Sequence, residues 1–446
     1  MTPADAPLPR RTVVTRAGPV ELAREKWRCT TCRVVFSPLD EQLGLTQEGY
    51  SPGVVRVVVR QGGPCPSFAD AARDLRELLD LRISPAHVRR LCERVGAEYA
   101  AARDAEVEAF RADRLGPAVG SAPAVAVVML DGGRVQARAA DGGRGVTGAG
   151  WKETRVGCCP SMASTEKAVD PQPDPPSKFL EPVAVARLAS ELKTRGGAAA
   201  RRSRVEPRPP GPPRRRRSGR PRARPRALVR TVVATMADRD TFGYPVAAEV
   251  QRRLGEASRK ACVCDGQKWN GSPFAVHLLP WGFIGILDVI HLVSYLYAAA
   301  DREPGWAVYE RWLRWAWAGH VDQVRTELER AAARLGRPPD GAKEDDPRAV
   351  VSEAFGYLTN NRDRMNDPEY RRRGLPISRA PVESVIKPVN RRVKGTEKFW
   401  LTAGAEAVLQ VRAAILSEDN RSQRYATKPR PRGRAVGNNR LTGRTK

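Results

Sequence analysis

The sequence predicts an α/β protein in which a mixed sheet is flanked by helices, with an all-α insertion and a helical region near the N-terminus. Apolar runs at 124–130, 260–264 and 282–287 are typical of short buried strands, and each is followed by an aspartate. Residues 67–113 show the capping signals of helices. Residues 291–335 are helical in pattern and rich in Trp, which favours a helical core over a base-stacking surface.

The positive charge of the 446-residue chain is large and unevenly distributed. The formal net charge is +27, which indicates a nucleic acid as partner. Residues 195–226 contain thirteen Arg and one Glu, and residues 421–446 contain nine Lys or Arg and no acid. Neither segment is able to build a core, so we expect a disordered Arg/Pro-rich insert and a disordered basic tail. The rest of the chain is only mildly basic.

Cysteine usage and hydropathy bear on the compartment. Eight cysteines in a chain of this length do not make a secreted disulfide framework, and no secretory signal opens the sequence. We therefore expect a cytoplasmic, nucleoid-associated protein. Residues 278–300 are long and apolar enough for a membrane span, but Asp288 and His291 lie at the centre, where a charge costs about 2.5–3.5 kcal/mol. A buried strand leading into a buried helix is expected instead, with no membrane partner.

The pair Cys29-x-x-Cys32 is half of a zinc site. No second close pair of ligands occurs in the first hundred residues, and Cys65 and His87 are badly spaced to complete the set. A structural zinc held by Cys29 and Cys32 and two ordinary cysteines are both open interpretations.

Residues 67–115 are typical of a helix-turn-helix. Ser67 and Ser84 are predicted N-caps, and Pro85 suits the first position of the second helix. Three basic residues on the second helix are expected to contact DNA: Arg89, Arg90 and Arg94. A helical hairpin with no DNA-binding role would show the same pattern.

Residues 371–400 place an acid, Glu383, among many bases. A helix from about Pro381 would bury the stripe Val382, Ile386, Val389 and Val393, with Glu383 on the edge beside it. Five bases of this segment are expected to contact DNA: Lys387, Arg391, Arg392, Lys394 and Lys398. A helix with a solvated charged face is the alternative. Pro388 would cost about 3 kcal/mol inside a helix, so either the helix bends there or this copy is inactive.

Three acids stand at positions that suit metal chemistry. Asp131 and Asp265 each end a predicted strand and precede Gly, and Glu383 lies near the start of a late helix. Because strand ends meet at one edge of a sheet, these carboxylates are expected to converge and to hold Mg²⁺ or Mn²⁺ for phosphodiester chemistry. A lone aspartate at a strand end is more often a cap or turn residue. Asp288 also ends a strand and is an alternative to Asp265.

Several passages together resemble the DDE transposases of bacterial insertion sequences, in particular the ISKra-type group. In chain order they are RCTTCRVVFSPLDEQLGL, LDGGRV, KACVCDGQKWN, GILDVIHLVSYLYAAA, YLTNNRDRM and GLPISRAPVESVIKPVNRRVKGTEKFW. The resemblance implies a ribonuclease-H-like fold with Asp131, Asp265 and Glu383 as the catalytic, metal-binding triad, and an all-α insertion between the last two. Asp288-x-x-His291 is similar to a motif that follows the second acid, which implies a role in ordering the metal ligands or the scissile strand. A structural Asp and a buried His are the alternative.

The sequence departs from the resemblance in two further places. Related chains carry an additional C-x-x-C upstream of the pair at Cys29, which leaves the zinc site open. Residues 195–226 are an insert relative to the family.

These observations predict a domain plan and a function. The predicted parts are 1–66 (N-terminal region), 67–115 (helix-turn-helix-like region), 120–290 (first part of the catalytic core), 291–370 (all-α insertion), 371–420 (last part of the core) and 421–446 (basic tail). The expected function is a transposase that cuts DNA at insertion-sequence ends and transfers the freed 3′ end to target DNA. Its cofactor would be Mg²⁺ or Mn²⁺, with Zn²⁺ at the cysteine pair if that site exists. Its partners would be terminal-repeat and target DNA and further copies of the chain. The alternatives are a catalytically inactive transposase-derived DNA-binding protein and a ribonuclease-H-like nuclease of DNA repair.

Overall fold

The structure is a computed structural model, and the chain forms two units within it. It describes residues 8–423 except 32, 34, 46–47, 118–121, 139–149, 197–224, 267–272, 301–304, 380–384, 386–387, 390–391 and 394–397. One unit comprises Met1–Gly96 and Asn420–Lys446, and the other comprises Ala97–Asp419.

The first unit opens with short strands that the sequence did not predict. They are β1 (Arg10–Thr15), β2 (Gly18–Ala23), β3 (Trp27–Arg28) and β4 (Val35–Phe36), followed by helix α1 (Pro38–Gln42). β1 pairs antiparallel with β2, and β3 pairs antiparallel with β4. Arg11 and Arg24 both form ion pairs with Asp40, at 2.7 and 3.1 Å, and so tie the first hairpin to α1.

Three helices complete the first unit. They are α2 (Pro52–Gly62), α3 (Phe68–Leu79) and α4 (Pro85–Arg111), of which α4 continues into the second unit. The predicted N-caps are confirmed, because Ser67 Oγ accepts a hydrogen bond from the Asp70 amide and Ser84 Oγ accepts one from the His87 amide. The helical hairpin predicted at 67–113 is therefore present.

α2 was not predicted, because its run of valines is more typical of a strand. It forms because Ser51 caps the first turn and one face of the helix is buried. Gly62, near the end of α2, lies so close to α4 that an added Cβ would fall 2.5 Å from Cys92 Sγ and 2.9 Å from Val88. This close approach packs α2 against α4.

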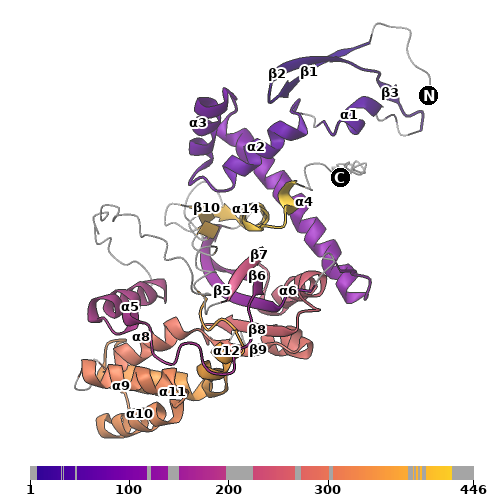
Figure 1. The fold of residues 1–446 in the computed structure, drawn as a ribbon. Coiled ribbons are helices and arrows are strands. Elements are labelled where there is room, and N and C mark those ends of the chain that lie inside the picture. Colours follow the sequence, from indigo (N-terminus) through magenta and orange to yellow (C-terminus); the bar gives the residue numbers. More distant parts are fainter. Residues whose placement is uncertain are drawn as a thin grey trace, which may run out of the picture. The chain divides into compact units, whose positions relative to one another are not determined.

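The second unit is built on a six-stranded mixed sheet (Figure 1). Its strands are β5 (Val125–Arg138), β6 (Gly150–Ala163), β7 (Arg226–Thr235), β8 (Arg259–Cys264), β9 (Ile284–Leu287) and β10 (Phe399–Leu401). The strand order is β7-β6-β5-β8-β9, with β10 beside β5. β5, β6 and β7 form an antiparallel meander, whereas β8 runs parallel to β5, β9 to β8 and β10 to β5. The predicted mixed sheet is confirmed.

One predicted strand end is wrong. The predicted buried run is 124–130. Residues 125–130 are buried, but Ala124 is exposed and lies outside β5, and the strand continues through Asp131 to Arg138. It continues because the later half still pairs with β6, with Asp131 opposite Val156, and then with β10. The other two ends are confirmed, since β8 stops before Asp265 and β9 stops before Asp288.

Helices flank this sheet. On one face, α6 (Arg239–Arg253) packs Phe242 and Val246 against the alternate β5 residues Ala126, Val128 and Leu130. α14 (Thr402–Leu416) packs on β7, where the Gln410 side chain donates to the Ala234 carbonyl at 2.5 Å.

The remaining helices form a bundle at the β9 end of the sheet (Figure 1). They are α5 (Pro182–Gly196), α8 (Val289–Ala300), α9 (Trp306–Trp317), α10 (Val321–Leu335) and α11 (Pro347–Asn360), and the short helix α12 (Asp367–Arg372) follows. Short 3₁₀ or π turns lie at Ser177–Phe179, Phe274–Leu278, Leu279–Trp281 and Arg362–Arg364. Trp312 and Trp317 are buried in the bundle core, which agrees with the expectation of a helical core for the Trp-rich segment.

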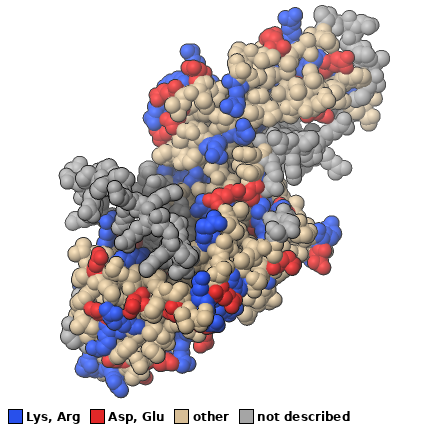
Figure 2. Space-filling view, viewed as in Figure 1, with Lys and Arg blue, Asp and Glu red and all other residues tan. Residues whose placement is uncertain are grey.

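The apolar run at 278–300 forms β9 and the buried helix α8, as predicted. Within the part of the chain that the structure describes, no helix has both the length and the apolar character needed to cross a membrane. Lys and Arg are interspersed with Asp and Glu on the face drawn in Figure 2, in agreement with a mildly basic folded body.

Candidate functional site

The sheet register places three aspartates in one row. Met129 of β5 pairs with Val263 of β8, and Cys264 of β8 pairs with Leu287 of β9. Asp131 and Asp265 each follow the first pair by two residues, so they lie level with one another. Asp265 and Asp288 each follow the second pair by one residue, so they also lie level. Because side chains alternate along a strand, and Leu130 and Cys264 belong to the core on the α6 face, Asp131 and Asp265 lie on the opposite face.

A guanidinium group lies among these three carboxylates. Arg379 Nη1 is 3.7 Å from Asp131 Oδ1 and 3.6 Å from Asp265 Oδ2, and Arg379 Nε is 3.2 Å from Asp288 Oδ2. Nη1 also donates to the Leu130 carbonyl at 2.9 Å. Arg379 is one of the bases that precede Glu383 in the sequence. Its place among the aspartates was not predicted, because only the fold brings it to the row.

Burial differs along the row. The side chains of Asp288, Asp265 and Arg379 are 1, 4 and 4% exposed, whereas that of Asp131 is 25% exposed. Asp131 is therefore the carboxylate of the row that a ligand arriving from solvent would meet first.

Asp288 is committed to local contacts. Its Oδ2 lies 3.1 Å from His291 Nδ1, and its Oδ1 accepts from the amides of Ile290 at 3.2 Å and Arg379 at 3.3 Å. His291 Nε2 in turn lies 3.5 Å from Arg379 Nη2. With both oxygens engaged, Asp288 orients His291 and Arg379, which fits a supporting role better than a metal-ligand role.

Burial and the neighbouring charges shift the pKa values of several side chains at the site. Burial raises the pKa of the Asp131 carboxyl above its usual value, while the Arg379 charge opposes this rise and the Asp265 charge adds to it. Burial also opposes ionisation of Asp288, but the hydrogen bond with His291 and the Arg379 charge outweigh it and hold the pKa of Asp288 below its usual value. Burial would lower the pKa of Arg379, but the three carboxylates raise it, so this guanidinium stays charged.

The backbone at Asp265 is held by residues of α11 and the turn after it. Tyr357 Oη donates to the Asp265 carbonyl at 2.7 Å. Gly266 has a φ of +77°, and an added Cβ would lie 2.8 Å from both the Asn361 amide group and Leu287. Tyr357 and Asn361 belong to YLTNNRDRM, a passage that carried the resemblance, and the structure shows that they support the turn after Asp265.

Two of the three predicted metal ligands are described, and they suit a hard divalent cation. Asp131 Oδ1 and Asp265 Oδ2 converge on one nitrogen atom from neighbouring strands, and carboxylate oxygens are the ligands that Mg²⁺ and Mn²⁺ prefer. Glu383, the third, lies outside the described residues. Within the described residues, no group of three or more His, Cys, Asp and Glu is arranged to hold a metal.

The acid-bearing segment is described only in part. Five of its residues are helical: Val385, Pro388, Val389, Arg392 and Val393. Val389 and Val393 are buried as predicted, and so is Val385, which the predicted stripe did not include. Of the stripe's other members, Val382 and Ile386 lie outside the described residues. Pro388 is half-buried within this helical segment.

The bases of this segment fall into two groups. Lys387, Arg391 and Lys394 lie outside the described residues. Arg392 is buried, with its guanidinium 5.1 Å from the centre of the Trp400 ring, an environment that favours a packing role over contact with DNA phosphates. Lys398 lies close to the Arg392 carbonyl, with its Nζ at 3.5 Å.

The other predicted DNA contacts are on α4. Arg89 and Arg90 are exposed, and Arg89 lies 3.9 Å from Glu93. Arg94 donates to both carboxylate oxygens of Glu48, at 2.8 and 2.9 Å. Arg89 and Arg90 are therefore better placed than Arg94 to meet a phosphate. Of the predicted zinc ligands, Cys29 is half-buried and Cys32 lies outside the described residues.

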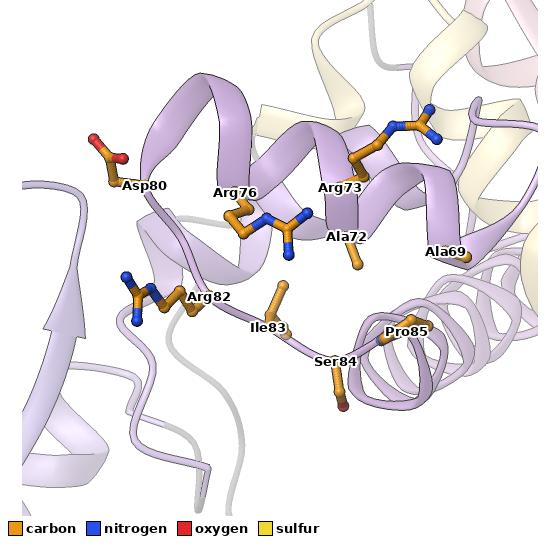
Figure 3. Close-up of a pocket in the computed structure, with 9 residues that line it drawn as sticks. All are labelled: Ala69, Ala72, Arg73, Arg76, Asp80, Arg82, Ile83, Ser84 and Pro85. Atoms are coloured by element: carbon orange, nitrogen blue, oxygen red, sulfur yellow. The ribbon is translucent and has the colours of Figure 1, made fainter.

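A hollow of about 860 Å³ opens beside the turn between α3 and α4. It is lined by Ala69, Ala72, Arg73, Arg76, Asp80, Arg82, Ile83, Ser84 and Pro85. Figure 3 shows Arg76 extending from α3 toward the segment that carries Ile83. Arg73 forms an ion pair with Asp70 at 3.0 Å. Arg73 and Arg76 of α3 and Arg82 of the turn are thus bases beside this hollow that were not among the predicted DNA contacts, all of which lie on the second helix or in residues 371–400.

A comparison of the chain with protein-family models gives no match, and a comparison with curated proteins gives no significant match.

Proposed function

We propose that this protein is a DDE transposase of the ISKra type, which cuts and transfers DNA strands with a divalent metal held by Asp131, Asp265 and Glu383. The observation that carries the proposal is the convergence of Asp131 Oδ1 and Asp265 Oδ2 on one point from neighbouring parallel strands. The strand order, an antiparallel meander extended by two parallel strands, is compatible with a ribonuclease-H-like sheet.

The described residues have distinct roles in this proposal. Asp131 is the more exposed ligand and faces the incoming DNA, whereas Asp265 is buried and held by the turn at Gly266. Asp288 orients His291 at the inner side of the site. A bound Mg²⁺ would activate the attacking oxygen and stabilise the leaving oxygen of the phosphodiester. The exposed Arg89 and Arg90 of α4 are proposed to contact terminal-repeat DNA, with affinity that falls as salt rises.

The test is strand cleavage on the DNA that flanks the protein's own gene. Purified full-length protein is incubated with Mg²⁺ or Mn²⁺ and a plasmid carrying both flanks, and the 3′ ends formed are mapped at single-nucleotide resolution. We expect cuts at fixed positions in both flanks. Asp265→Asn should reduce cutting by at least about 10³-fold, because one metal ligand is lost. Asp240→Asn, which changes an exposed carboxylate on α6, is the matched control and should cut normally.

Three other results would contradict the proposal in different ways. Full cleavage by Asp265→Asn would show that this carboxylate is not part of the reacting site. Metal-dependent cutting at positions unrelated to the flanks would favour a ribonuclease-H-like nuclease. Specific binding to the flanks with no cutting in either metal would favour the inactive DNA-binding protein.

The inactive protein is the second candidate because of one specific observation. Arg379 holds the position between Asp131 and Asp265, and in that position it satisfies the carboxylates that would otherwise bind metal. If Arg379 never leaves, the protein would bind DNA without cutting it.

A further inference from the structure

The position of Arg379 has a consequence for how the site is controlled. A buried guanidinium needs anionic partners, and Arg379 has three within 3.7 Å. Its Nη1 reaches the same two oxygens, Asp131 Oδ1 and Asp265 Oδ2, that would bind a divalent metal. A metal bonded to those oxygens would lie next to a positive charge that is itself only 4% exposed, where solvent screens repulsion poorly.

We infer that Arg379 is an internal competitor of the metal, and that metal binds to Asp131 and Asp265 only when the Arg379 guanidinium withdraws from them. The inference rests on the proposed metal site and concerns its regulation.

The anchoring of Arg379 allows such a withdrawal. Residues 375–379 belong to neither a helix nor a strand, and the Ile377 carbonyl accepts a hydrogen bond from the Val289 amide at 3.0 Å. A movement confined to the Arg379 side chain leaves this backbone hydrogen bond in place. Arg379 has a second set of contacts away from the Asp131–Asp265 pair, through Nε to Asp288 and through Nη2 to His291. A small rotation of the guanidinium toward Asp288 and His291 would free the two metal-binding oxygens while keeping Arg379 paired. In this role, His291 and Asp288 hold the Arg379 guanidinium when it is withdrawn from Asp131 and Asp265.

The test measures Mn²⁺ affinity of the full-length protein without DNA, by the loss of the free Mn²⁺ signal in electron paramagnetic resonance. Wild type is compared with Arg379→Gln, which removes the charge but keeps a polar side chain. We expect Arg379→Gln to bind Mn²⁺ at least ten-fold more tightly. Adding Asp131→Asn to this variant should abolish the gain, which locates the bound ion. Arg239→Gln, which removes an exposed positive charge in α6, is the control for net charge and should bind like wild type.

Removing Arg379 leaves buried carboxylates without their cation, so Arg379→Gln by itself is at risk of unfolding. The double variant Asp288→Asn/Arg379→Gln removes the most buried carboxylate as well and keeps the Asp131–Asp265 pair. It should show the same gain in Mn²⁺ affinity over Asp288→Asn alone. If Arg379→Gln folds only when Mn²⁺ is added, the ion has replaced the guanidinium and the inference is supported.

Unchanged or weaker Mn²⁺ binding in both Arg379 variants would overturn the inference, because a competitor's removal must raise affinity. The readout separates this inference from the proposed function. If wild type cuts DNA at specific positions but the Arg379 variants gain no Mn²⁺ affinity, the competitor role is wrong and the proposed transposase function is supported. If the variants gain Mn²⁺ affinity but the protein cuts no DNA, the competitor role is supported and the proposed transposase function is wrong.

Discussion

The free energy of unfolding should vary with pH to a large extent through one buried carboxyl group. Asp367, the first residue of α12, is 3% exposed. Burial raises its pKa from 3.8 to about 7; the nearby charge of Arg371 opposes the rise, and those of Asp288 and Asp170 add to it. Between pH 3.8 and about 7 the native protein therefore holds a proton on Asp367 that the unfolded chain has released.

The sign follows from this proton balance. Because the native state binds more protons than the unfolded state in this window, this group's contribution makes stability fall as pH rises from about 4 to 7 and level off above. A difference of about three pH units at 1.36 kcal/mol each gives a loss of about 4 kcal/mol. Asp367→Asn stays neutral at every pH, so its stability should lack this slope. The unfolding free energy of the variant minus that of wild type should therefore rise by about 4 kcal/mol between pH 4 and pH 8.

The assay is urea denaturation of wild type and Asp367→Asn at several pH values from 4 to 8, followed by tryptophan fluorescence. The quantity of interest is the difference in unfolding free energy between the two proteins, because other groups titrate equally in both. Asp363→Asn, at a nearby exposed position, supplies the background and should follow wild type. A difference that stays constant within about 1 kcal/mol from pH 4 to 8 would refute the reasoning, since it would mean that Asp367 ionises normally in the native state.

Two further substitutions test contacts that hold the site region together. Arg371→Ala should lower the free energy of unfolding by about 3–5 kcal/mol, because it removes the cation that pairs with the Asp170 carboxylate. The two groups lie 2.5 Å apart, and the Arg371 side chain is only 6% exposed. A loss below about 1 kcal/mol in urea denaturation would contradict this. Gly266→Ala should destabilise by about 1–3 kcal/mol, because φ is +77° and the new Cβ would lie 2.8 Å from Asn361; cleavage assays should show a parallel loss, and normal stability with normal cleavage would show that the turn tolerates a side chain.

Local patterns were sufficient for much of the fold. Short apolar runs predicted β8 and β9, and an Asp follows the end of each as expected. Serine caps predicted α3 and α4 because a cap acts within one turn of helix. Where the local signal was ambiguous, prediction failed: the valines of α2 were not recognised as a helix, and the extension of β5 past Asp131 depends on pairing with distant strands.

The basic residues show the limit of a one-dimensional reading. Arg379 and Arg392 lie in the same basic segment, and the sequence offers no means to separate them from exposed bases. In the structure Arg379 is buried among three aspartates, and Arg392 is buried against Trp400. A charge pattern indicates how many cations a segment carries, but it does not say which of them face solvent, because that depends on what packs against the segment.

The sequence by itself determined that apolar strands lead to Asp265 and Asp288, and that a helical, Trp-rich segment follows. These are properties of short stretches, set by hydrophobic periodicity and by side chains that bond to their own backbone. Only the tertiary structure decided that Asp131, Asp265 and Asp288 form one row with Arg379 among them. Strand order and register decide which distant residues become neighbours, and they are set by burial of the whole sheet between its helices.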